Sequence, residues 1–249
     1  MCLCRVDNSM KINNFGKIDH SDFNDFVVHF TGRSGPSHRA SGIKSMSDWS
    51  RLKNIITNSI LIGSEMPPFR DSAVCFTEAT ADGCSWLIGE GRYTSCGIAF
   101  NKRDIFEVGG GPVLQVRGDE WGVVRNWPVN LRSRAVRLWP GAIAEVGEAL
   151  PLWLESRSEW LFEREWRVPT PNIGFQFTLD QVAFLVIPSL SELRNWVREL
   201  STLNLALAGQ VASMRYVVIS GNGIVESSGV RRRNGPKSLS SGEPEGLTT

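Results

Sequence analysis

The order of the apolar segments constrains the fold of this chain more than any other feature of its sequence. Short strand-like runs outnumber helical ones, and the helices interrupt the strands without a regular strand–helix alternation. A doubly wound parallel sheet requires that alternation, because its crossover connections are usually helices. We therefore predict an α+β fold with mixed or largely antiparallel sheets and interspersed helices.

Local periodicity predicts the individual elements. Apolar residues recur at helical spacing in residues 45–64, where Ser45 or Ser47 supplies the N-cap, and again in residues 189–203. Residues 142–156 indicate a further helix. The runs that favour strands are residues 26–31, 72–79, 160–169, 181–188 and 214–220.

Length and composition suit one ordinary soluble domain. The chain has 249 residues, of which 41% are hydrophobic and 21% charged. We expect a flexible N-terminus over residues 1–20, a single domain over residues 21–228, and a disordered tail over residues 229–249, where apolar residues are sparse. The net charge of +1 indicates no global attraction to nucleic acid or to a membrane.

Neither disulfides nor metal sites are indicated by the cysteines and histidines. The five cysteines are an odd number, and no zinc-binding spacing occurs. A zinc site built from His29, His38 and a cysteine is the alternative, and it has little support. The sequence contains no run of about 18 apolar residues and no signal-peptide core, so we expect no membrane span and a cytoplasmic location.

The stretch "WLFEREWRVP", residues 160–169, places two glutamates inside an apolar strand pattern. With a period of two, Glu163, Glu165 and Arg167 share one face of the strand. Two neighbouring carboxylates repel each other unless a cation lies near, and Arg167 is a candidate for that cation. A charged, solvent-facing edge strand is the alternative interpretation.

Two other strands carry polar side chains at alternate positions. His29 and Thr31 point to one side of the first strand. In "VCFTE", Cys75 and Thr77 point to one face of the strand, and Phe76 and Glu78 point to the other. Such groups suit a ligand-binding cleft, although a surface strand has a similar pattern.

Basic and aromatic residues interleave over residues 117–139. Trp121 and Trp127 lie near Arg117, Arg125 and Arg132 in the sequence. Such interleaving suits stacking on single-stranded bases. Plain packing of the two tryptophans is the alternative.

The order of these segments resembles that of the DarT-type ADP-ribosyltransferases. The likeness lies in an H-x-T strand, a loop, a helix ending in "LKNIITNSILIGS", the "VCFTE" strand and a late glutamate strand, over about residues 25–190. "CFTE" with "EREWRV" also resembles phage-resistance proteins of the AbiGi type. The chain departs from the pattern in Arg167, where relatives tend to be apolar, and in the long loop over residues 32–47.

This resemblance implies an ADP-ribosyltransferase-like fold that uses NAD as co-substrate and modifies a nucleic acid, DNA or RNA, as a toxin or anti-phage defence effector. It implies that His29 and Thr31 hold NAD, with Arg70 or Arg51 as the arginine. We expect "VCFTE" to form the floor of the cleft, with Thr77 or Glu78 near the ligand. Glu165 is expected to be the catalytic carboxylate, with Glu163 in a supporting role. An antitoxin or regulatory protein is a further expected partner.

The chemistry of the proposed reaction gives both glutamates a role. Cleavage of the bond between nicotinamide and ribose builds positive charge on the ribose, which a carboxylate stabilises. A second carboxylate orients or deprotonates the acceptor. Two alternatives remain: a non-catalytic antitoxin or interaction protein with the same fold, and a metal-dependent nuclease that uses Glu78, Glu163 and Glu165.

Overall fold

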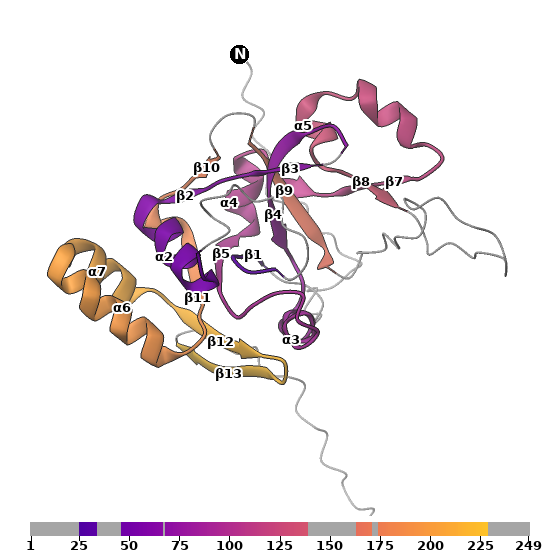
Figure 1. The fold of residues 1–249 in the computed structure, drawn as a ribbon. Helices are drawn as coiled ribbons and strands as arrows, with labels where there is room; N and C mark the ends of the chain where they lie inside the picture. The colour runs from indigo at the N-terminus through magenta and orange to yellow at the C-terminus, as the bar shows by residue number, and fades with distance from the viewer. Residues whose placement is uncertain (1–24, 34–45, 67, 139–162, 171–173, 229–249) are drawn as a thin grey trace, which may run out of the picture.

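The computed structural model describes residues 25–33, 46–66, 68–138, 163–170 and 174–228 (Figure 1). The helix predicted over residues 142–156 and the two terminal segments lie outside these residues. So does His38 of the disfavoured zinc site.

A nine-stranded sheet forms the centre of the fold, in the order β13-β12-β11-β5-β1-β4-β9-β6, with β3 pairing to β4. The strands β11 and β12 run parallel, and the other paired strands of this sheet run antiparallel. The predicted α+β class with a mixed sheet is confirmed. The strands are β1 (Phe26–Phe30), β3 (Ser64–Met66), β4 (Asp71–Thr77), β5 (Gly97–Asn101), β6 (Gly111–Pro112), β9 (Glu165–Pro169), β11 (Val182–Val186), β12 (Tyr216–Ser220) and β13 (Gly223–Ser228).

Helices flank the sheet. They are α2 (Asp48–Asn58), α3 (Ala81–Gly89), α4 (Lys102–Glu107), α5 (Val129–Arg132), α6 (Leu190–Leu203) and α7 (Leu205–Ser213), with 3₁₀ turns η1 (Trp121–Asn126) and η3 (Leu179–Gln181). The helices α2 and α6 were predicted. Of the two candidate caps, Ser47 is the one used, because its side chain accepts a hydrogen bond from the Ser50 amide. The sequence did not predict α3, α7 or β13.

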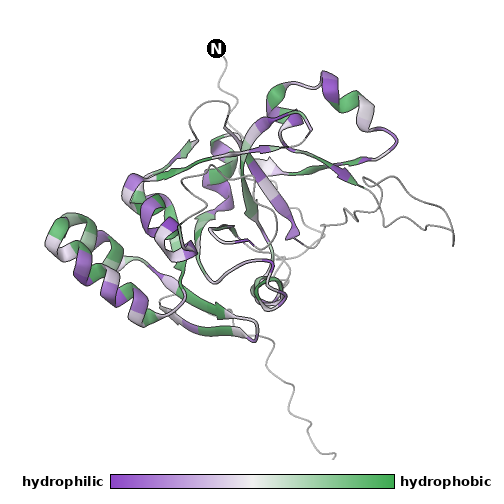
Figure 2. Cartoon of the chain, viewed as in Figure 1, coloured by the Kyte–Doolittle hydropathy of each residue, from purple (hydrophilic) through white to green (hydrophobic). Residues whose placement is uncertain are grey.

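Each side of the sheet packs against its own hydrophobic cluster. On one side, here called the α2 face, Val27, Val74, Phe76, Ile98 and Phe100 pack with buried residues of α2 and α6. On the other side, the α3 face, Val28, Phe30, Ala99, Val186 and Val217 pack with buried residues of α3. Figure 2 shows hydrophilic and hydrophobic residues side by side along α6, as expected for a helix that covers a core.

Residues 114–138 form a smaller unit beside the main sheet, here called the β7–β8 unit (Figure 1). Its strands β7 (Leu114–Arg117) and β8 (Ala135–Leu138) pair in parallel, and η1 and α5 lie in the connection between them. A small core of Val116, Val124 and Ala135 holds the unit together, with Trp121 and Trp127 packed against it. A separate two-stranded pair joins β2 (Ile60–Leu61) to β10 (Phe175–Gln176). No helix in the described ranges has both the length and the apolar character needed to cross a membrane.

Candidate functional site

Strand register decides which of the predicted site residues meet. Thr77 of β4 lies opposite Val28 of β1 on one side and opposite Glu165 of β9 on the other. Cys75 lies opposite Arg167 in the same way. Because side chains alternate along a strand, these four polar side chains share the α3 face with Val28. The predicted common face of Cys75 and Thr77 is confirmed.

Glu165 is oriented by Arg167. The Arg167 Nε donates to the Glu165 Oε1 at 2.8 Å, and Nη2 donates to Oε2 at 3.4 Å. Arg167 is itself fixed, because its Nη1 donates to the backbone oxygens of Ser133 and Ala135 in the β7–β8 unit. The Glu165 side chain remains 19% exposed. A carboxylate held in one direction and still open to solvent has the geometry of a group that acts on a ligand.

Glu163 reaches the same face by a different route from the one predicted. It lies before β9, and Arg164 has a left-handed backbone with φ of 47°, so strand alternation does not extend from Glu165 back to Glu163. The prediction that alternation alone aligns Glu163 with Glu165 is therefore wrong. The Glu163 carboxylate instead accepts hydrogen bonds from the Tyr93 hydroxyl and from Arg92 Nε.

Glu163 is a buried structural partner in this arrangement. Its side chain is 4% exposed, and Arg92 Nε lies 2.5 Å from its Oε1. The Tyr93 ring, which donates to Glu163 through its hydroxyl, stacks on Phe30 of the α3 face. The Thr77 hydroxyl donates to the Glu163 backbone oxygen and accepts from the Ala79 amide, and Thr77 is buried. Thr77 thus holds the backbone that leads into β9.

Three further residues near Glu163 and Glu165 were not predicted from the sequence: Arg33, Arg92 and Tyr93. Arg33 is exposed and forms a β-bridge with Tyr93. Burial, followed by the nearby Glu163, raises the pKa of the Tyr93 phenol, whereas the charge of Arg33 acts in the opposite sense. Burial and Glu165 likewise raise the pKa of the Cys75 thiol, and Arg167 and Arg33 oppose this rise. Arg33 thus lies within electrostatic reach of both positions.

We call this group the polar cluster of the α3 face: Arg33, Arg92, Tyr93, Glu163, Glu165 and Arg167. Each glutamate has its own arginine, so the two carboxylates do not share one cation. Arg33 forms no ion pair with any residue in the part of the chain that the structure describes. The cluster therefore combines one partly open carboxylate with one available guanidinium. One sequence signal could have indicated Arg33: it lies just after the strand predicted over residues 26–31, which carries His29 and Thr31.

His29, Thr31 and Arg51 lie on the opposite face, where Thr31 and Arg51 contact each other. His29 lies opposite Ile98, its Nδ1 is 2.8 Å from the Cys75 backbone oxygen, and its ring meets Phe76 edge-on. The Thr31 hydroxyl donates to the Asp48 backbone oxygen at the start of α2. Arg51 Nη1 donates to the Thr31 backbone oxygen and to the Asp48 carboxylate. The structure does not bring these three residues to Glu165.

The side chains of Arg70 and Glu78 do not join that of Glu165 either, although the Glu78 amide donates to the Arg164 backbone oxygen. Arg70 is exposed in the turn before β4, at the opposite end of that strand from Thr77. Glu78 accepts hydrogen bonds from Trp166 Nε1 and Lys102 Nζ, and Trp166 points to the α2 face. Among the described residues, no group of three or more His, Cys, Asp or Glu side chains could hold a metal ion. The nuclease alternative therefore has no metal site in this part of the chain.

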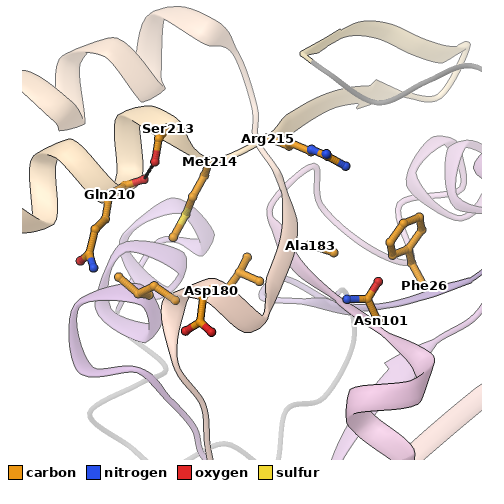
Figure 3. A pocket seen from close by; sticks show the side chains of 10 residues that line it. Phe26, Asn101, Asp180, Ala183, Gln210, Ser213, Met214 and Arg215 are labelled. Carbon is orange, nitrogen blue, oxygen red and sulfur yellow. Dashed lines mark hydrogen bonds between the residues drawn. The ribbon is translucent and has the colours of Figure 1, made fainter.

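A pocket of about 480 Å³ lies elsewhere, at the end of the sheet where β1 and β11 begin (Figure 3). Phe26, Asn101 and Met214 line it, and the charged side chains of Asp180 and Arg215 lie on different sides of it. None of the predicted site residues lines this pocket. In particular, neither Glu163 nor Glu165 faces this pocket.

Comparison with family models, curated proteins and solved structures found no match to this chain. The fold and the site therefore define this protein by its fold class and its cluster of charged residues, and not by a family. It is an α+β protein with a mixed nine-stranded sheet and two glutamate–arginine pairs, Glu163–Arg92 and Glu165–Arg167, on one side of that sheet.

The placement of His29 leads to a test. We expect His29→Ala to lower the free energy of unfolding by about 1–2 kcal/mol, because it removes the contact with the Cys75 carbonyl and the packing on Phe76. From the sequence, the stability was expected to stay nearly unchanged while NAD binding weakened. Urea denaturation and NAD titration of the same variant separate the two roles. Unchanged stability with weaker NAD binding would restore the role expected from the sequence.

Proposed function

We propose that this protein transfers ADP-ribose from NAD to a nucleic acid, with Glu165 as the carboxylate that stabilises the transition state. The observation that carries the proposal is the state of Glu165, which is oriented by Arg167, partly exposed, and set on β9 between β4 and the short edge strand β6. Loss of nicotinamide leaves developing positive charge on the ribose. A fixed carboxylate lowers that barrier more than a mobile one, because it needs no reorganisation during the reaction.

The other residues of the polar cluster suit the same substrate. Arg33 forms no ion pair within the described ranges. A guanidinium group can donate two parallel hydrogen bonds to two oxygens of one phosphate. We therefore assign to Arg33 the binding of the NAD pyrophosphate. Arg92, Tyr93 and Glu163 fix the chain that enters β9, and so we assign Glu163 a positioning role in place of acceptor activation. The roles of His29, Thr31, Arg51 and Arg70 in NAD binding stay predictions.

The biological setting belongs to the same proposal. An enzyme that modifies nucleic acid and consumes NAD is harmful to its own cell, so a toxin or anti-phage effector that an antitoxin restrains is the setting we propose. The support is the motif order of residues 25–190 together with the polar cluster.

A non-catalytic interaction protein is the second candidate, and one observation favours it. Both glutamates form ion pairs within the chain, Glu163 with Arg92 and Glu165 with Arg167. Structural ion-pair networks have the same appearance as a resting active site. The two candidates differ in whether NAD is consumed.

Incubation with NAD labelled in the adenylate phosphate decides between them. Single-stranded DNA, duplex DNA and RNA are offered separately, and the label on nucleic acid and the release of nicotinamide are both measured. We expect label transfer that EDTA does not abolish. If purified full-length protein neither transfers label nor releases nicotinamide with any acceptor, the enzymatic proposal is wrong and the interaction protein is favoured. Cleavage of the nucleic acid that EDTA abolishes would support the nuclease.

A further inference from the structure

The β7–β8 unit carries an excess of positive charge that the polar cluster does not use. Residues 114–138 contain five arginines and two acidic residues, Asp119 and Glu120, although the whole chain is nearly neutral with 27 basic and 26 acidic residues. A local excess of this kind on a nearly neutral protein directs an anionic partner to one surface.

Among the residues that the structure describes, ion pairs neutralise only part of this charge. Arg117 pairs with Asp119, and Arg132 forms two hydrogen bonds to Asp71. Arg125 is exposed and forms no ion pair with another described residue. Arg134 donates to the Asn130 backbone oxygen, which leaves its charge uncompensated.

A stack of flat side chains lies among these charges. The Arg132 guanidinium lies 5.4 Å from the centre of the Phe69 ring. Phe69 in turn stacks on Trp121, with ring centres 5.8 Å apart and planes 28° from parallel. Both rings are only partly buried, and the exposed Arg70 is the direct neighbour of Phe69. Unpaired bases stack on aromatic rings and on arginine in this way.

The β7–β8 unit, which carries Trp121 and Arg132 of this stack, contacts the proposed catalytic strand. Arg167, which orients Glu165, donates to the backbone of Ser133 and Ala135 in the same unit. The β7–β8 unit is thus joined directly to the residue that orients Glu165, whereas Arg70 lies at the end of β4 away from Thr77.

We propose that the surface formed by Arg70, Arg125 and the Phe69–Trp121–Arg132 stack binds single-stranded nucleic acid. The assignment of this surface to the acceptor of ADP-ribose rests on the proposed function. Charge alone would also attract an acidic protein, but the stacked rings favour a partner that presents unpaired bases. Arg70 thereby gains a role at the acceptor, although the resemblance places it at NAD.

Binding is tested without NAD, so that the result does not depend on catalysis. Fluorescence anisotropy of the full-length protein is measured with a labelled unpaired oligonucleotide and with the matching duplex, at several salt concentrations. The test variant is Arg70→Ala with Arg125→Ala, both exposed and outside the polar cluster. The matched control is Arg194→Ala with Arg198→Ala on α6, which lies on the other side of the molecule (Figure 1).

We expect the test variant to bind the unpaired oligonucleotide about tenfold more weakly, and the slope of log affinity against log salt to fall by about 1.4, which corresponds to two phosphate contacts on a single strand. The control variant should bind within about twofold of the parent, and the duplex should bind more weakly than the single strand. Equal losses in both variants, or no binding by the parent, would overturn the surface. Binding of the oligonucleotide without transfer of label from NAD would support the binding surface and contradict the transferase activity. If the test variant transfers ADP-ribose with an unchanged KM for the nucleic acid, the proposed binding surface is wrong and the proposed transferase activity holds.

Discussion

Replacing Glu165 with glutamine is expected to lower the rate of ADP-ribose transfer by about 10²-fold or more, while NAD affinity changes little. Glutamine keeps the shape of the side chain and can still accept a hydrogen bond from Arg167, but it has no charge to oppose the positive ribose. Arg167 also keeps its bonds to the backbone of the β7–β8 unit, so the local structure should survive. Single-turnover transfer from labelled NAD measures the effect.

The control is Glu107→Gln, which removes an exposed carboxylate that pairs with Arg103 on α4. We expect this variant to transfer ADP-ribose at the parental rate and to melt at the parental temperature. Full activity of Glu165→Gln in a protein that does transfer would mean that the Glu165–Arg167 pair is only structural. The transfer proposal would then need another carboxylate.

Replacing Glu163 with glutamine is expected to act mainly on stability. The change removes the negative charge that Arg92 pairs with, in a site where Glu163 is almost fully buried. Breaking a buried pair from one side typically costs about 3–5 kcal/mol, and we expect about 2–4 kcal/mol here because Arg92 retains some access to water. Urea denaturation gives the free energy directly.

A double-mutant cycle with Arg92→Met shows whether the loss comes from the pair. If it does, the double variant should be more stable than Glu163→Gln alone, because the partly buried charge of Arg92 is removed together with that of Glu163. The sequence predicted a different result, namely impaired use of the acceptor with NAD hydrolysis retained. Unchanged stability together with that acceptor defect would return Glu163 to the catalytic role.

Local signals were sufficient for several elements and failed for others. The helices α2 and α6 combine a serine cap with a continuous apolar stripe, so the sequence predicted both. The helix α3 contains Gly83 and ends in Gly89, and its burial against β12 and β13 compensates for this weak helical propensity. The strand β13 follows β12 after the two residues Gly221 and Asn222, a hairpin signal that the sequence does contain.

The sequence by itself determined the alternation within each strand. It placed Cys75 with Thr77, and Glu165 with Arg167, on common faces, and the structure agrees. Alternation has a period of two in every strand, so it depends on no distant residue. The sequence could not determine how the face of one strand relates to the face of the next.

Only the tertiary structure decided that relation. The register that sets Val28 opposite Thr77, and Thr77 opposite Glu165, puts His29 on the other side of the sheet from Glu165. A shift of one residue would reverse this result, because it exchanges the two faces of a strand. The same is true of Arg92, which reaches Glu163 across 71 residues of sequence. The left-handed Arg164 ends the alternation before Glu163, so the environments of the two glutamates are set by folding and not by their spacing.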